Sequence, residues 1–148
     1  MADTTAVEKA IKNLSGAEKW LGRGEIKALP SILWEDELPE KIIQGSYNNG
    51  QGILVATNKR LVFVDKGLMS LKVEDFPYDK ITSIQYSTGM LMGGIDIYAS
   101  GNKAEIKNAT KDQVKPFAEY VRARITGTSI HASIPASPPM DDPVKKLK

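Results

Sequence analysis

The sequence predicts an α+β, mainly β domain, in which about seven antiparallel strands form a barrel of two near-orthogonal sheets with helices before and after it. Short β-branched and aromatic runs, separated by turn residues, fill residues 41–107. Apolar residues at helical spacing precede these runs and follow them. With 148 residues, 41% of them hydrophobic, the chain is long enough for one core.

The N-terminal segment carries helix signals. Residues 5–8, Thr-Ala-Val-Glu, form a capping box, and an apolar stripe follows at Val7, Ala10, Ile11 and Leu14. Residues 15–18 repeat the capping pattern before Trp20 and Leu21, which predicts a second short helix after a break at Ser15-Gly16. Residues 25–33 are expected to add one or two helical turns, with Pro30 near their start or at a kink.

The strand signals form a meander. The predicted strands are residues 41–47, 52–57, 60–65, 72–76, 80–86, 94–99 and 103–107. Asn48-Asn49-Gly50, Asn58-Lys59 and Ser100-Gly101-Asn102 are the hairpin turns, because asparagine and glycine tolerate a positive φ. We expect Asn58 to take the left-handed conformation, and Gly93-Gly94 to mark a turn or bulge rather than a phosphate cradle.

A last amphipathic helix closes the barrel. Residues 110–113 form a further capping box, and apolar residues recur at Val114, Phe117, Ala118, Val121 and Ile125. Residues 126–140 are rich in Ser, Pro and Gly and are expected to form a flexible linker. The expected organisation is an N-terminal helical extension (1–24), the barrel domain (25–125), and a linker with the start of a C-terminal helical segment (126–148).

Two strands need cover on both faces. Residues 53–55 and 61–64 are apolar throughout, whereas a half-exposed antiparallel strand alternates, as residues 103–107 do. Either the N-terminal helices or a second subunit must therefore cover the second face. The helical side chains suited to this are Val7, Ile11, Leu14, Trp20 and Trp34.

Three segments carry a family resemblance. They are Gly-Ile-Leu-Val-Ala-Thr-Asn-Lys-Arg-Leu at 52–61 with its continuation to Gly67, Phe-Pro-Tyr-Asp-Lys-Ile at 76–81, and Gly-Gly-Ile-Asp-Ile at 93–97. The chain resembles the YokE-like bacterial pleckstrin-homology (PH) family over residues 25–125, which implies a PH-like barrel. Residues 141–148 resemble the first turn of a short C-terminal helical domain found in that family. Whether the chain is cut there or ends early stays open, as does a host or phage origin.

The residues argue against an enzyme. The chain has no cysteine, and its one histidine, His131, falls in the predicted linker. The carboxylates at 35–37 and 74–75 lack an apolar pocket and are expected on solvated faces. We therefore predict no catalytic residue, no metal and no cofactor. A net charge of +2 without a basic patch predicts no nucleic-acid binding, and the lack of a signal or membrane segment favours the cytoplasm.

The candidate binding residues are apolar side chains in two predicted turns. They are Leu68, Met69 and Leu71 in one turn and Met90, Leu91 and Met92 in the other. They form either an interface or part of the core, and Leu71 and Leu91 could fold inward. The preferred hypothesis is a protein–protein contact, including self-association, because related bacterial PH proteins assemble. The alternatives are weak binding to an anionic membrane with help from Lys66 and Lys72, and small-molecule binding at the open corner of the barrel.

Overall fold

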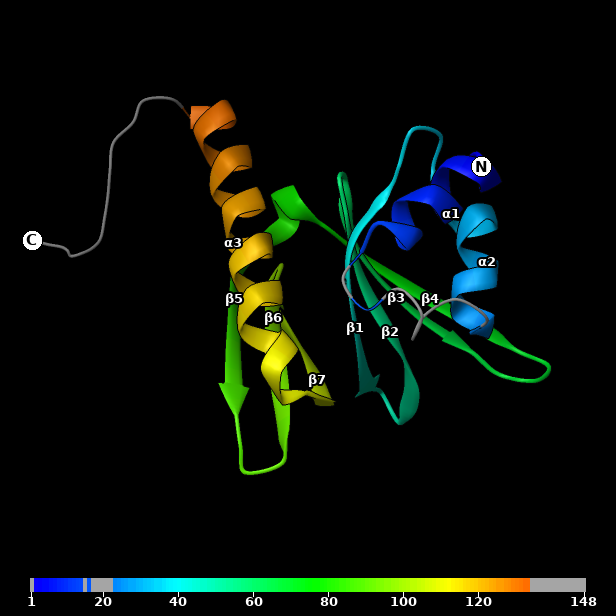
Figure 1. The fold of residues 1–148 in the computed structure, drawn as a ribbon. Coiled ribbons are helices and arrows are strands. Elements are labelled where there is room, and N and C mark those ends of the chain that lie inside the picture. Colours follow the sequence, from blue (N-terminus) through cyan, green and yellow to red (C-terminus); the bar gives the residue numbers. More distant parts are fainter. Residues whose placement is uncertain (1, 15, 17–22, 134–148) are drawn as a thin grey trace, which may run out of the picture.

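The computed structural model describes residues 2–14, 16 and 23–133. Two helices, α1 (Thr4–Lys12) and α2 (Gly24–Ile32), come before seven strands, and the long helix α3 (Lys111–Ser133) comes after them (Figure 1). The strands are β1 (Pro39–Tyr47), β2 (Gly50–Thr57), β3 (Arg60–Lys66), β4 (Leu71–Pro77), β5 (Ile81–Thr88), β6 (Met92–Ala99) and β7 (Asn102–Thr110). A short 3-10 helix, η2 (Tyr78–Lys80), joins β4 to β5. All seven predicted strands are confirmed.

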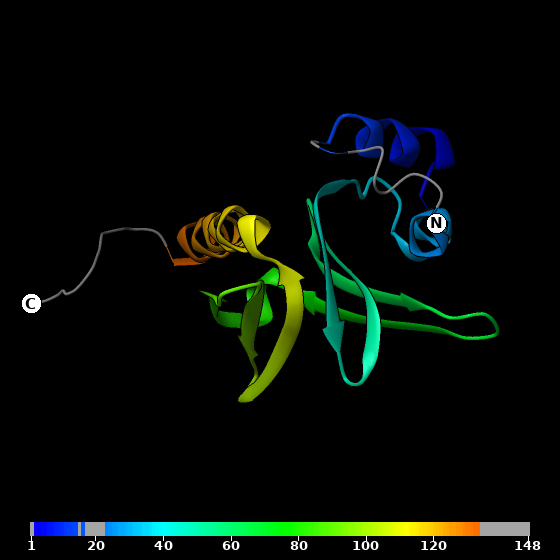
Figure 2. The same ribbon diagram turned by 60° about the horizontal axis from the view of Figure 1, so that its bottom comes forward.

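The strands form one open antiparallel sheet in the order β4-β3-β2-β1-β7-β6-β5. The two predicted sheets are therefore two halves of one sheet, β1–β4 and β5–β7. They join where Ser46 of β1 pairs with Lys107 of β7. Figure 2 shows α3 on the side of the β5–β7 half and the N-terminal helices beyond the β1–β4 half. In the described part of the chain, β4 and β5 are the free edges.

Positive φ angles occur in two of the predicted hairpin turns. Asn48 and Asn49 have φ of 50° and 65°, and Ser100 and Gly101 have φ of 52° and 80°. Two consecutive left-handed residues give the twist that suits a two-residue hairpin. The predicted irregularity at Gly93-Gly94 is also confirmed, because the β6–β7 register shifts between Gly93 and Ile95.

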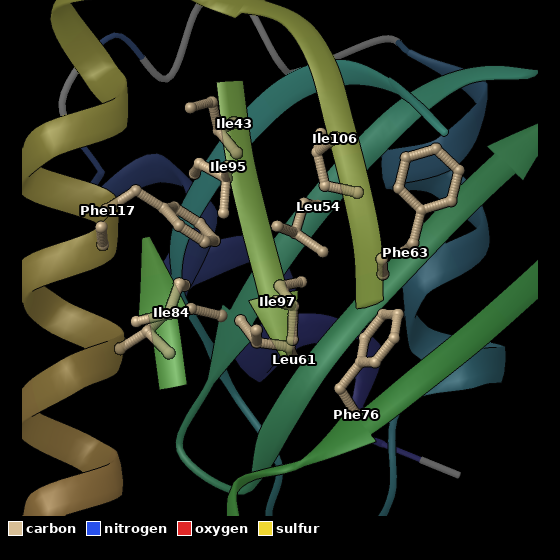
Figure 3. Packing of buried hydrophobic residues seen from close by; sticks show 14 of the residues in the cluster. Ile43, Leu54, Leu61, Phe63, Phe76, Ile84, Ile95, Ile97, Ile106 and Phe117 are labelled. Carbon is tan, nitrogen blue, oxygen red and sulfur yellow. The ribbon is translucent and has the colours of Figure 1, made fainter. Parts of the chain in front are cut away.

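The main core lies between the two halves of the sheet and under α3. Figure 3 shows Phe117 of α3 pointing toward Ile43, Ile84 and Ile95, as expected for a helix that closes the barrel. Val114, Phe117, Ala118 and Val121 are all buried, so the predicted apolar face of α3 is confirmed.

A second core lies on the opposite face of β2 and β3. Ile53, Val55, Val62 and Val64 pack there against α1 and α2. The main helical contributors are Val7, Ile11, Ile26, Leu29 and Leu33, with Leu14 at the margin. The N-terminal helices therefore cover the second face, as the first of the two alternatives predicted. Trp34 lies at the rim with 47% of its surface exposed, and Trp20 lies outside the described residues.

Three local predictions need correction. Asp3, not Thr5, caps α1, because its carboxylate accepts hydrogen bonds from Thr5 N–H and Ala6 N–H. Asn58 has no positive φ; its side chain instead accepts from Leu38 N–H at 2.8 Å and donates to Asp36 O at 3.0 Å.

The third correction concerns the predicted linker. Helix α3 continues to Ser133, so the first eight residues of that segment are helical and His131 lies in the last turns of α3. The rest of the segment and the second predicted N-terminal helix fall on residues outside the described part of the chain.

Candidate functional site

The tip of the β3–β4 hairpin carries two fully exposed apolar side chains. Leu68 is 96% exposed and Met69 is 94% exposed. The turn is closed by a hydrogen bond from Gly67 N–H to Ser70 O at 2.9 Å, so the two side chains project from an ordered turn. Both are therefore available for contact, and neither belongs to the core.

The β5–β6 turn carries a second exposed apolar group. Met90 is 90% exposed, Leu91 is 81% exposed, and Met92 is half-exposed. Gly89 N–H donates to Met92 O at 2.8 Å, and the Lys111 ammonium donates to Met90 O at 3.3 Å. Leu91 therefore does not fold inward. Figure 1 shows the two tips projecting from different halves of the sheet, so the structure does not bring them together.

The two predicted basic residues flank the β3–β4 tip. Lys72 stands opposite Asp65 in the strand register, and the Lys66 ammonium donates to Gly67 O at 3.0 Å. Over β3 and β4 as a whole, three basic residues are balanced by three acidic ones, which are Arg60, Lys66 and Lys72 against Asp65, Glu74 and Asp75. The hairpin has no net positive charge.

Strand β4 adds exposed apolar surface next to this tip. Leu71 and Val73 are 46% and 42% exposed, on a strand that pairs only with β3 among the described residues. Val73 stands opposite Val64, at the edge of the second core. The residue pattern of 72–76 predicts a strand but not its place in the sheet. Only the order of strands in the sheet identifies it as an edge.

A buried polar group, which no local sequence pattern predicts, connects the segment before β1 to the β2–β3 turn. Glu37 is completely buried, which corrects its expected place on a solvated face. Its carboxylate accepts from Arg60 Nε at 2.9 Å and Nη2 at 3.1 Å, from Thr57 Oγ1 at 2.6 Å and from Trp34 N–H at 2.8 Å. Every contact of this carboxylate is with a donor, so the charge is compensated within the protein.

Other residues complete this buried group. The Arg60 guanidinium lies 3.8 Å from the centre of the Trp34 ring and also donates to Asp75 at 3.2 Å. The Tyr78 hydroxyl donates to Thr57 O at 2.6 Å, and burial raises the pKa of Tyr78 above its usual value. The Thr-Asn-x-Arg motif at 57–60 and the Phe-x-Tyr motif at 76–78 therefore have a structural role, because their side chains hold the β2–β3 turn in place.

Several clefts open on the surface of the described residues. One of about 460 Å³ is lined by residues that include Asn58, Lys59, Tyr78 and Arg124. One of about 480 Å³ lies at the β1–β7 seam, and one of about 230 Å³ lies at the corner between β4 and the β6–β7 hairpin. Tyr47 lines the last two, and burial, followed by its hydrogen bond to Glu74, raises its pKa to about 12. A smaller cleft of about 100 Å³ is lined by residues that include Tyr47 and Phe63, and all of these clefts are candidate places for a small molecule.

No group of three or more His, Cys, Asp or Glu side chains in residues 2–14, 16 and 23–133 could hold a metal ion. Over the same part of the chain, no helix is long and apolar enough to cross a bilayer.

A family comparison matches the bacterial PH domain over residues 33–123, from the end of α2 to the middle of α3. No curated protein matches the chain. The matched segment includes both exposed tips, the buried Glu37–Arg60 pair and all seven strands.

Solved structures give similar folds at low identity. The C-terminal domain of an unknown protein from Leishmania infantum matches with a TM-score of 0.51 and 16% identity, over 67% of this chain and 93% of that one. A DUF1696 family protein with a pleckstrin-homology domain from Shewanella loihica matches with 0.49 and 24%, over 67% and 91%. The Vps36 N-terminal PH domain matches with 0.49 and 14%, over 66% and 86%. At these identities the likeness concerns the fold alone.

Proposed function

The chain belongs to the bacterial PH domain family, a family of binding modules, and we propose that it acts by protein–protein contact and associates with itself through the β3–β4 hairpin. The observation that carries this proposal is the exposure of Leu68 and Met69 at 96% and 94%, next to the half-exposed Leu71 and Val73. Large apolar side chains grouped on a surface usually mark a contact site. The YokE-like subfamily is part of the proposal, supported by residues 52–61 and 76–81.

The membrane alternative has less support. An apolar tip flanked by two lysines suits an anionic bilayer, but two lysines contribute only about 2 kcal/mol. In addition, Glu74 and Asp75 lie on the same hairpin and offset that attraction. The charge balance of β3 and β4 therefore favours a protein partner.

Small-molecule binding also has less support. Ligand pockets are usually enclosed and mainly apolar, with a few placed polar groups. The two larger clefts here are lined mostly by polar and charged residues, among them Lys59, Arg124, Lys103 and Lys107.

Sedimentation velocity tests the proposal. We expect the sedimentation coefficient of the wild type to rise with concentration up to tens of micromolar, and the double substitution Leu68→Ser/Met69→Ser to reduce that rise. Both residues are exposed, so folding should be unaffected. Met90→Ser/Leu91→Ser removes similar apolar surface from the other tip and is the matched control.

A wild type that stays monomeric over this range would contradict self-association. Flotation with phosphatidylserine vesicles separates the membrane alternative. If the wild type floats with the vesicles, Leu68→Ser/Met69→Ser does not, and the two proteins sediment alike, the membrane alternative replaces our proposal.

A further inference from the structure

Strand β4 is a free edge of the sheet in the described part of the chain, where it pairs with β3 alone. An unpaired edge offers backbone N–H and C=O groups to another strand, and the charged side chains of β4 restrict which strand can pair with it. We infer that two copies of this chain join through antiparallel pairing of β4 with β4, centred on Val73, into one continuous sheet. This inference rests on the proposed self-association and specifies its geometry.

The charges of β4 select one register. With Val73 opposite Val73 of the second copy, Lys72 stands opposite Glu74 and Glu74 opposite Lys72, so the twofold symmetry forms two opposite-charge pairs. A shift that centres the pairing on Lys72 or on Glu74 places like charges opposite each other at the centre. Opposite charges across strands are favourable and like charges are unfavourable. Of the registers centred on Lys72, Val73 and Glu74, only the one centred on Val73 makes β4 complementary to a second copy of itself.

The apolar side chains fit the same register. Leu71 and Val73 share the sheet face that carries Val62 and Val64 of the second core, because Val73 stands opposite Val64. Pairing of β4 with its copy brings the two exposed Val73 side chains together at the rims of the two second cores. The first residue of β4, Leu71, then stands opposite Asp75 of the other copy, so the hairpin tip lies next to the end of the paired strands.

The helices leave room for this arrangement. Among the strands, α2 packs mainly on β3, so the two α2 helices lie over strands three spacings apart. Three spacings of about 4.8 Å place them about 14 Å apart, whereas a helix with its side chains is about 10–12 Å wide. The two helices can therefore lie side by side without overlapping, over the sheet face that carries Leu71 and Val73 of both copies.

The other free edge is better protected. The Arg122 guanidinium of α3 donates to Ile84 O of β5 at 2.9 Å, and α3 packs along β5. Part of the hydrogen-bonding capacity of that edge is therefore already used. This difference makes β4 the edge available to a second copy.

Single cysteines test the register directly, because the chain has none of its own. In the centred register the cysteines that Val73→Cys introduces into the two copies lie directly opposite, at about 4.5–5.5 Å between Cα atoms, which a disulfide can span. We expect Val73→Cys to form a disulfide-linked dimer under mild oxidation. Ser87→Cys, at an exposed position on the β5 edge, is the matched control and should stay monomeric. A mixture of Lys72→Cys and Glu74→Cys chains should cross-link more than either chain alone.

Charge exchange is the second test. We expect Lys72→Glu and Glu74→Lys each to raise the dimer dissociation constant roughly tenfold, because each substitution turns two attractive pairs into repulsive ones. The double variant Lys72→Glu/Glu74→Lys should return to the wild-type constant. Lys80→Glu makes the same charge change at an exposed site off the edge and should have no effect.

The outcomes separate this inference from the proposal beneath it. The β4 register is wrong if the wild type dimerises but Val73→Cys cross-links no more than Ser87→Cys and the double charge variant does not recover the wild-type dissociation constant. Self-association itself would then still be supported. A wild type that is monomeric in sedimentation overturns both. Selective cross-linking at position 73 with rescue by the double variant supports both.

Discussion

The guanidinium of Arg60 and the carboxylate of Glu37 form a two-point ion pair in the interior, with Nε–Oε2 and Nη2–Oε1 distances of 2.9 and 3.1 Å. The side chain of Arg60 is 6% exposed and that of Glu37 is 0% exposed. Arg60 also donates to Ile32 O at 3.1 Å. The pair therefore connects the end of α2, the segment before β1 and the start of β3.

Replacing Arg60 should destabilise the domain strongly. Arg60→Met leaves the Glu37 carboxylate buried without its cation, which typically costs about 3–5 kcal/mol. Urea denaturation should show this loss as a lower midpoint with an unchanged slope. The double variant Glu37→Leu/Arg60→Met should lose clearly less than the sum of the two single variants, because neither charge is then left alone.

The surface pair of Lys103 and Glu105 is the matched control for that experiment. Its N–O distance is shorter, 2.7 Å, but both side chains are about 40% exposed. Lys103→Ala should leave the urea midpoint close to that of the wild type, since solvent screens an exposed pair. Equal losses at the buried and the exposed pair would contradict the role assigned to burial.

Two glycine substitutions should act in opposite directions. A Cβ on Gly52 would lie 2.2 Å from Val64 O, so Gly52→Ala should force β2 away from β3 at a cost of about 1–3 kcal/mol. A Cβ on Gly127, inside α3, meets nothing within 4 Å. Gly127→Ala should therefore stabilise the protein by about 0.5–1 kcal/mol through helix propensity. Thermal melts in one buffer should show a lower melting temperature for Gly52→Ala and a higher one for Gly127→Ala than for the wild type. A lower melting temperature for Gly127→Ala would contradict the expected gain in helix propensity.

Alkaline pH should weaken the fold. Burial raises the pKa of Tyr47 from 10 to about 12 and also raises that of Tyr78, so the unfolded chain loses these protons first. Their contribution to the free energy of unfolding is complete below pH 10 and is lost as the pH rises toward 12 and beyond. Urea denaturation at successive pH values should show this fall. Tyr47→Phe should make it shallower, and an unchanged profile would exclude Tyr47 as a cause.

The N-terminal helix should be an integral part of the domain. Ile11 is fully buried in the second core, so Ile11→Ala should cost about 2–5 kcal/mol. We expect circular dichroism and tryptophan fluorescence to report the same single transition. Two separate transitions would show that α1 folds independently. Leu68→Ala, at an exposed position, is the control and should leave the midpoint unchanged.

Local pattern was enough to predict the strands and the cover on both faces of β2. The strands alternate or are β-branched, and the double apolar faces of residues 53–55 and 61–64 required a second layer. The exposed tips at Leu68 and Leu91 were also identified as candidates. The ends of the strands decide which apolar residues of these two turns are buried. Sequence patterns predict strand ends only to within a few residues.

The errors at Glu37 and Asn58 have a common physical cause, which is a partner far away in the sequence. Glu37 looked solvated because Arg60 lies 23 residues further on. Asn58 looked like a left-handed turn residue, but its amide bonds to Leu38, 20 residues earlier. The free edge of β4 likewise depends on which strands are neighbours, and this follows from the whole sheet rather than from residues 71–77.

The second core has a practical consequence for anyone who isolates this domain. The segment recognised as the bacterial PH domain starts at residue 33, one residue after α2 ends. A fragment trimmed to those limits would leave Ile53, Val55, Val62 and Val64 bare to water along two adjacent strands. Such a fragment should aggregate or bind chaperones. Proteins captured with it would then bind the apolar surface exposed by removing α1 and α2, and not a surface of the intact domain.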